Sequence, residues 1–136
     1  MRIDGTTELV GIIGYPLRHT LSPAMHNAAF RALEMNWAYV PLRVAPGGLR
    51  AALDGMRCLG FRGANVTIPH KVETALCLAE LRGDADLLRA VNTVVVEDGS
   101  LIGYNTDAEG FNRFLEEEGI RADGSVPLII GAGGAA

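Results

Sequence analysis

The sequence has few cysteines, few basic residues and no long hydrophobic run. Its 136 residues contain two cysteines, and twelve Lys and Arg stand against sixteen Asp and Glu, for a net charge of −4. Binding to nucleic acid needs a concentrated cationic face, so no nucleic-acid partner is expected. The longest polar-free stretch, residues 126–136, is far shorter than the ~20 apolar residues that cross a bilayer. Asp4 and Glu8 stand where a signal peptide would have its apolar core, so no membrane partner is expected either.

The cysteines and histidines are scattered along the chain. Cys58 and Cys77 form no CxxC motif, and His19, His26 and His70 have no carboxylate cluster beside them. This spacing predicts no metal site. It favours free, buried thiols in a reducing compartment, which we expect to be the cytoplasm.

The composition is that of a globular domain, with 49% hydrophobic and 21% charged residues, enough for one core. Short apolar runs alternate with apolar stripes at helical spacing. The predicted strands are residues 9–14, 37–43, 61–67, 91–96, 101–104 and 127–130. The predicted helices are residues 22–36, 49–59, 70–81, 84–88 and 106–118. This alternation predicts an α/β fold of three layers, in which a mostly parallel sheet is flanked by helices on both faces.

Local signals support several of these boundaries. Ser22 before a proline is typical of a helix N-cap, and Thr106 with Glu109 is spaced as a capping box. The pair Asp98-Gly99 predicts the turn of a hairpin. A polar, glycine-containing connection at residues 119–125 predicts a boundary between a domain of residues 1–119 and a second unit at residues 120–136.

Polar side chains follow or flank the predicted strands where ligands bind in open α/β sheets, beyond the carboxyl ends of the strands. The candidate ligand-binding residues are Thr20, Ser22, Asn65, Thr67, Lys71, Asn92 and Asp107. Hydroxyls and amides with one ammonium and one carboxylate suit a small, hydroxyl-rich, neutral or anionic ligand. Each residue alone has a simpler explanation: a helix cap, a strand threonine, a turn asparagine, a solvated lysine, or a carboxylate at a helix start.

Lys71 is predicted to lie in the first turn of a helix, where the unpaired N–H groups make a cation unfavourable. A carboxylate such as Asp107 would compensate. A lysine under these opposing influences can exchange a proton near neutral pH. We therefore expect Lys71 and Asp107 to meet across the strand ends as a proton-transfer pair.

The last six residues, GAGGAA, follow the predicted strand 127–130 and satisfy the pattern G-x-G-x-x-A. This pattern is typical of the first turn of a dinucleotide-binding Rossmann domain, where the backbone approaches a pyrophosphate. A plain glycine-rich turn remains the alternative. We expect the chain to end in the first strand of such a domain, truncated before its helix.

Five segments together resemble the shikimate dehydrogenase family. They are residues 18–23 (RHTLSP), 63–71 (GANVTIPHK), 90–93 (AVNT), 103–111 (GYNTDAEGF) and 131–135 (GAGGA). The family motifs occur in the same order over nearly the whole chain, which makes the combination specific.

The resemblance implies reversible reduction of 3-dehydroshikimate to shikimate with NADPH, in the pathway to chorismate and the aromatic amino acids. It makes Lys71 the acid/base and Asp107 its partner. Thr20 and Ser22 would bind the substrate carboxylate. The ring hydroxyls would be bound by Asn65, Thr67 and Asn92. The phosphates of NADP would be bound by Gly131, Ala132, Gly133, Gly134 and Ala135.

The resemblance also sets the expected organisation. This chain would be the substrate domain of the enzyme, inactive in hydride transfer by itself, with the pocket lying between it and a following Rossmann domain. The unpaired apolar segment after residue 125 could pair with a second copy, so a homodimer is one expected partner.

Two positions depart from the family pattern. Thr20 stands where the family usually has serine, and Arg89 stands where it usually has glycine. A quinate/shikimate or aminoshikimate dehydrogenase, a non-catalytic sensor of a cyclitol acid, and an unrelated nucleotide-binding protein remain alternatives. The choice between NAD and NADP depends on residues beyond Ala136.

Overall fold

The computed structural model describes residues 3–121, 123–124, 126–131 and 133–134. Within these residues the strands are β1 (Glu8–Gly14), β2 (Trp37–Arg43), β3 (Phe61–Val66), β4 (Glu80–Leu81), β5 (Thr93–Glu97) and β6 (Ser100–Tyr104). The helices are α1 (Ser22–Ala32), α2 (Leu49–Cys58), α3 (Lys71–Cys77), α4 (Asp84–Leu88) and α5 (Asp107–Glu117). The predicted α/β class with a helix-flanked sheet is confirmed.

The six strands form one mixed sheet in the order β2-β1-β3-β5-β6-β4. The pairs β1–β2, β1–β3 and β4–β6 are parallel, whereas β5 is antiparallel to both of its neighbours. Because β5 runs against β3, its first residue lies at the same edge of the sheet as the last residues of β1, β3 and β6. This edge receives the loops that carry the candidate residues.

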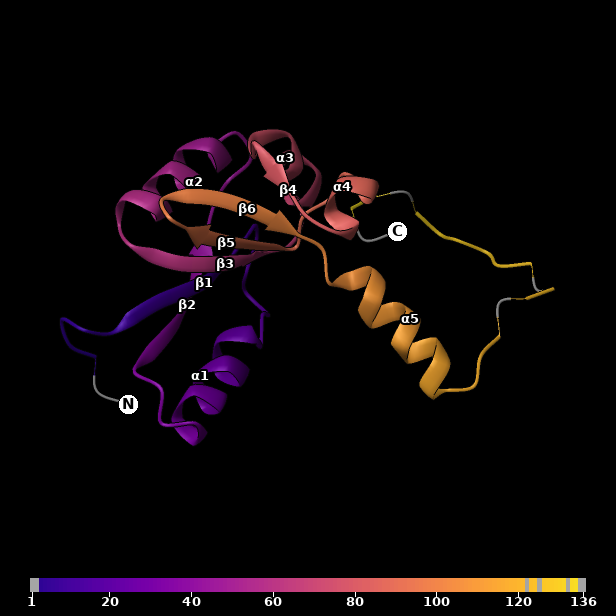
Figure 1. Cartoon of the computed structure of the whole chain (residues 1–136), viewed down its shortest axis with the longest axis horizontal. Helices are drawn as coiled ribbons and strands as arrows, with labels where there is room; N and C mark the ends of the chain where they lie inside the picture. Colours follow the sequence, from indigo (N-terminus) through magenta and orange to yellow (C-terminus); the bar gives the residue numbers. More distant parts are fainter. Residues whose placement is uncertain (1–2, 122, 125, 132, 135–136) are drawn as a thin grey trace.

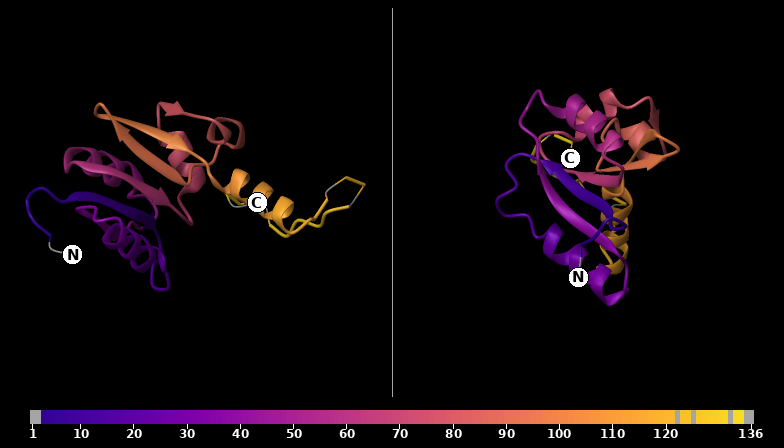
Figure 2. Two further views of the ribbon diagram at one scale, coloured as in Figure 1. Left: turned by 60° about the horizontal axis from the view of Figure 1, so that its bottom comes forward. Right: turned by 90° about the vertical axis from the view of Figure 1, so that its left-hand side faces the viewer.

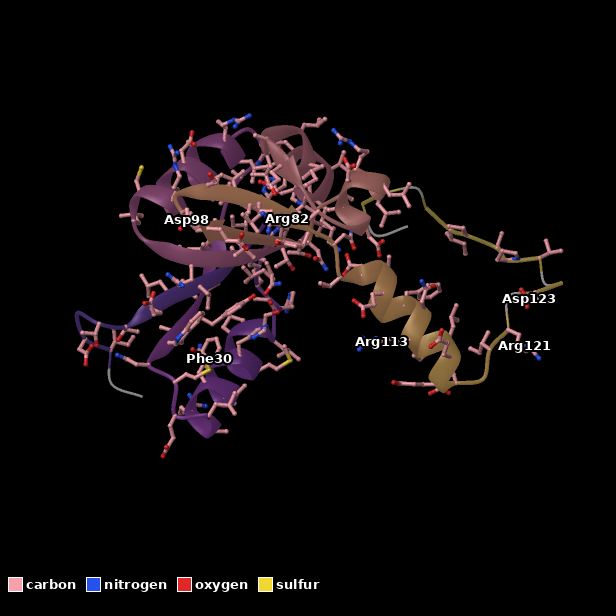
Figure 3. The ribbon with its side chains drawn as sticks, in the orientation of Figure 1. Phe30, Arg82, Asp98, Arg113, Arg121 and Asp123 are labelled. Carbon is pink, nitrogen blue, oxygen red and sulfur yellow. The ribbon has the colours of Figure 1, made fainter. Side chains whose placement is uncertain are left out.

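Helices cover the two faces of the sheet unequally. Figure 1 shows α1 on one side and α2 and α3 on the other. Phe30 of α1 packs against a small cluster that contains Ile12, Leu17 and Tyr39 (Figure 3). The larger cluster lies on the α2 side and includes Ile13, Leu49, Leu53, Met56, Phe61 and Val94. Burial of these side chains is the main stabilising contribution to the fold.

The predicted hairpin is confirmed. Asp98 and Gly99 link β5 to β6 with φ of 48° and 75°. Two successive left-handed residues form the turn type whose twist matches a two-stranded ribbon. Asp98 marks this end of the hairpin in Figure 3.

The predicted helix over residues 70–81 is too long. The structure ends α3 at Cys77, and Glu80–Leu81 form a strand that pairs with Ile102 and Gly103 of β6. The apolar stripe was compatible with both assignments, and the tertiary pairing with the open edge of β6 decides for the strand. The first helix also ends early, at Ala32, because Glu34 takes a left-handed φ of 55°.

Both predicted side-chain caps are absent from the described helices. The N-cap residues, Leu21 of α1 and Thr106 of α5, form no side-chain cap hydrogen bond, and Ser22 is the first residue of α1 rather than its N-cap. Thr106 does not form the expected capping box, because its hydroxyl accepts a hydrogen bond from Asn92 instead (2.8 Å). The first N–H of α5, on Asp107, donates to the side chain of Asn105 (2.9 Å).

Three further expectations concern the cysteines and the end of the chain. Both cysteines are free, but neither is buried as predicted: Cys58, which ends α2, is exposed, and Cys77, which ends α3, is half-buried. Residues 126–130 form no strand, because no neighbouring strand among the described residues offers backbone partners. Figure 2 shows α5 projecting from the sheet and the extended segment that follows it. None of the described helices has the length and apolar character needed to span a membrane.

Candidate functional site

The candidate residues gather at the edge of the sheet where β1, β3 and β6 end. Thr20 lies in the connection from β1 to α1, Ser22 begins α1, and Asn65 lies in β3. Asn92 directly precedes β5, and Asp107 begins α5 after β6. Since β5 is antiparallel to β3, Asn65 and Thr93 stand opposite each other in register.

Lys71 and Asp107 form the charged centre of this edge. The Lys71 Nζ lies 2.6 Å from Asp107 Oδ2, so the expected meeting of the two side chains is confirmed. The lysine side chain is 13% exposed and the aspartate side chain 46% exposed. Lys71 is the one lysine in the sequence, all other cationic side chains apart from histidine being arginines. The backbone also fixes its position, because Val91 N–H donates to the Lys71 carbonyl (2.9 Å).

Asn92 connects the charged pair to the sheet. Its Nδ2 donates to Asp107 Oδ1 (2.9 Å) and to the Thr106 hydroxyl (2.8 Å). Its Oδ1 accepts from the Thr106 N–H (3.1 Å) and from the Thr93 hydroxyl (2.9 Å). Both oxygens of the Asp107 carboxylate thus receive a donor, one from Lys71 and one from Asn92. The carboxylate is thereby held in one orientation beside the ammonium.

Three residues of the network, Tyr39, Thr93 and Thr106, were not predicted as site residues. Thr93 accepts from Asn65 Nδ2 (3.3 Å), and the hydroxyl of Tyr39 donates to Asn65 Oδ1 (2.7 Å). Thr93 belongs to the AVNT segment and could have been found there. Tyr39 lies inside an ordinary apolar strand, and only the register of β2 relative to β1 and β3 brings it to Asn65. No local signal in the sequence marks it.

Burial and hydrogen bonding determine the protonation of Tyr39. Burial raises the pKa of Tyr39 to about 12, opposed in part by a hydrogen bond with Ser22. Tyr39 as a whole residue is 4% exposed to solvent. The phenol therefore stays protonated through the neutral range and can act as a donor to Asn65.

The remaining predicted residues lie at the same edge but outside this side-chain network. Thr20 Oγ1 accepts from the Ser22 N–H (3.3 Å) and so closes the turn before α1. Thr67 is anchored through its backbone, with its N–H on Ile13 (2.9 Å) and its carbonyl accepting from His70 (3.0 Å).

The predicted cofactor turn lies against Lys71. A Cβ placed on Gly134 would come within 2.9 Å of Lys71 Cβ, so this close approach requires glycine. Gly131 has a φ of 113°, a conformation that favours glycine, and its Cα faces open space. An exposed glycine backbone of this kind fits the approach of a phosphate group. The predicted residues Ala132 and Ala135 lie outside the described residues.

A hollow of about 510 Å³ adjoins the network on the α1 side of the sheet. Asn65 and Thr93 line it, together with the aromatic side chains of His26, Phe30 and Trp37. Within the part of the chain that the structure describes, no three His, Cys, Asp or Glu side chains gather as a metal site would require. The site is thus built from amides, hydroxyls and one ion pair.

The fold and the site define an α/β domain with a polar centre at the carboxyl ends of its strands. Over residues 12–94 the sequence matches the family described as the shikimate dehydrogenase substrate binding domain. The chain belongs to this family.

Relatives and solved structures agree with this assignment. A protein of Carboxydothermus hydrogenoformans named shikimate dehydrogenase (NADP(+)) is 53% identical over 136 residues, which is 100% of this chain and 49% of that protein. A solved shikimate dehydrogenase in complex with NADP+ is 48% identical, with a TM-score of 0.90 over 98% of this chain and 47% of that chain. A shikimate 5-dehydrogenase from Listeria monocytogenes in complex with shikimate and NAD is 43% identical, with a TM-score of 0.82 over 89% and 42%. The chain spans about half the length of the curated relatives it matches.

Proposed function

We propose that the chain is the substrate-binding half of a shikimate dehydrogenase that reversibly reduces 3-dehydroshikimate to shikimate with NADPH. The observation that carries the proposal is the Lys71–Asp107 ion pair, held by Asn92 at the edge of the sheet where α/β proteins bind ligands. The family membership and the relatives solved with shikimate or NADP+ support it.

In this proposal Lys71 moves the proton of the reaction. During reduction its ammonium donates a proton to the oxygen of the ring ketone, and during oxidation its amine takes the proton back from the hydroxyl. Asp107 holds the ammonium beside the reacting oxygen and stabilises its charge. The contacts of Lys71 with Asp107 and of Asp107 with Asn92 supply the fixed geometry that proton transfer requires.

Polar groups around this pair would bind the rest of the ring. Thr20 and Ser22 lie on the α1 side, where their hydroxyls can donate to a carboxylate. Asn65, Thr67 and Asn92 lie on the β3–β5 side and offer amide and hydroxyl groups to ring hydroxyls. The set of donors matches a small, hydroxylated acid.

NADPH, when bound, supplies the hydride. The backbone of Gly131 and Gly133 would face its phosphates, and the packing of Gly134 on Lys71 brings the turn close to the acid/base. Residues 120–136 would open the nucleotide-binding domain, following the substrate domain of residues 1–119. The free thiols of Cys58 and Cys77 suit a reducing compartment, so we assign the reaction to the cytoplasm.

The proposal is tested on the protein at its full natural length. Shikimate and NADP+ together should give NADPH, detected by its absorbance, and quinate should react far more slowly. Failure to oxidise shikimate while binding it would favour the sensor, and faster oxidation of quinate would favour the quinate/shikimate alternative.

A further inference from the structure

Tyr39 is held on every side, although it does not belong to the charged centre. The side-chain amide of Asn27 on α1 bonds both backbone groups of Tyr39, accepting from its N–H and donating to its carbonyl (both 2.9 Å). The ring stacks on His26 with centroids 4.3 Å apart and planes inclined by 7°. The hydroxyl at the far end of this ring is therefore placed as rigidly as the backbone of β2.

The direction of each hydrogen bond can be followed from the carboxylate outward. Asp107 Oδ1 is a pure acceptor, so the group of Asn92 that faces it is Nδ2. The oxygen of Asn92 then faces Thr93, whose hydroxyl must donate to it. Having used its proton, that hydroxyl accepts from Asn65 Nδ2. The oxygen of Asn65 faces Tyr39, which must donate.

Orientation, rather than proton transfer, is what this chain of bonds provides, since side-chain amides are poor proton carriers. The orientation of Asn92 is secured twice, because the Thr106 N–H also donates to its oxygen. The orientation of Asn65 has no such second support within its described hydrogen bonds, which join it to Tyr39 and Thr93 alone. The hydroxyl of Thr93, whose proton is used on Asn92, accepts from Nδ2, and the phenol of Tyr39 donates to Oδ1, so these two contacts together specify which end of the Asn65 amide faces which way.

We propose that Tyr39 is a positioning residue: its hydroxyl fixes the amide of Asn65 so that an N–H, and not the carbonyl, is offered to an oxygen of the bound ring. The inference rests on the proposed function only in taking Asn65 as a substrate contact. Tyr39 itself acts through Asn65. The raised pKa of Tyr39, about 12, keeps the proton on the phenol that this role requires.

The test is Tyr39→Phe in the full-length protein, since phenylalanine keeps the ring stacking and the packing. We expect the KM for shikimate to rise about fivefold to tenfold, the effect of one hydrogen bond, with little change in kcat. The matched control is Tyr104→Phe, which removes a hydroxyl that accepts a hydrogen bond from Arg82 (2.8 Å) in an exposed contact, away from Asn65. It should leave KM unchanged.

The second measurement is the NMR signals of the Asn65 side-chain amide, recorded without ligand. These signals would not change if Tyr39 only stabilised the fold. The wild-type protein should show one amide orientation, and Tyr39→Phe should show two orientations or a reversed one. If Tyr39→Phe fails to fold, Thr93→Val tests the next bond in the same way, and Thr93→Ser should restore the wild-type signals.

The outcomes separate this inference from the proposed function. A wild-type protein that ignores shikimate overturns the proposed function, while the amide signals still report on Tyr39. An unchanged KM and unchanged Asn65 signals in Tyr39→Phe overturn the positioning role and leave the dehydrogenase intact.

Discussion

Lys71 and Asp107 meet at 2.6 Å although they lie 36 positions apart in the sequence. The first residue of α3 supplies the ammonium and the first residue of α5 the carboxylate. Two helices that begin at one edge of the sheet thus place opposite charges together. Five predictions follow from the contacts around this pair and around the strands beneath it.

Replacing Lys71 by methionine keeps the aliphatic stem and removes the ammonium. In the full-length protein we expect kcat to fall about 10²-fold to 10⁴-fold, the usual contribution of a general acid/base, with only a modest change in shikimate affinity. Arg113→Met is the control, because it removes a cation from the outer surface of α5, where its side chain is 70% exposed (Figure 3). Loss of binding alone, with no turnover in the wild type, would indicate a sensor.

The Asp107→Asn variant should make Lys71 more reactive toward an acylating reagent. The carboxylate holds the Lys71 Nζ in a 2.6 Å ion pair, and removing its negative charge weakens this contact and makes the amine more accessible to a reagent. Mass spectrometry of the peptide that contains Lys71 measures the rate of acylation. An equal rate in the variant and the wild type would mean that the 2.6 Å contact does not control the amine in solution.

Asn92→Ala should lower the free energy of unfolding by about 2–3 kcal/mol, because it leaves buried donors and acceptors without partners. Asn92 is 8% exposed and its side chain takes part in four hydrogen bonds. Urea denaturation measures the change. Asn112→Ala, at an exposed position of α5, should cause little loss, and equal effects of the two substitutions would contradict the prediction.

Two glycine-to-alanine substitutions should act in opposite directions. A Cβ on Gly63 would clash with the backbone carbonyl of Val94 in the paired strand β5, which cannot move without breaking the ladder. We expect a loss of about 2 kcal/mol or more from this overpacking. Gly55 lies in α2 with open space around it, so alanine there should stabilise by about 0.5–1 kcal/mol. Thermal unfolding of the two variants measures both changes in stability, and shifts in the same direction would contradict the prediction.

Tyr39 should make the stability of the protein fall at alkaline pH. Its pKa of about 12 lies above the ordinary value of 10.0, so the folded state holds the proton more tightly than the unfolded state. The contribution, at most about 3 kcal/mol, is complete below pH 10 and is lost as the pH rises toward 12. Urea unfolding across this range should show a steeper decline for the wild type than for Tyr39→Phe. Tyr15→Phe, at a 48% exposed tyrosine, serves as the control and should follow the wild type.

Much of the fold could be predicted from local patterns. The hairpin turn at Asp98-Gly99 follows from the need for two left-handed residues, and α4 follows from its apolar and acidic spacing. The end of α3 could not be predicted, because the apolar residues among positions 78–81 fit the pattern of a helix and that of an edge strand equally well. Pairing with β6 decides between them.

The candidate site was predictable in its members but not in its connections. Lys71, Asn92 and Asp107 were found because they follow or flank predicted strands and lie in segments that resemble the family motifs. The use of Thr106 as an acceptor for Asn92, in place of a helix cap, depends on a neighbour 14 positions away. Rules based on neighbouring residues in the sequence cannot predict which of these two roles Thr106 takes.

The sequence by itself determined the alternation of strands and helices and the placing of hydroxyl, amide and charged side chains at their ends, because these depend on periodicity and turn chemistry within a few residues. The tertiary structure alone decided the strand order and the pairing of β5 with β3, and with them the contact of Tyr39 with Asn65. Both depend on the register between strands that are distant in the chain, and register is chosen by the packing of the whole sheet.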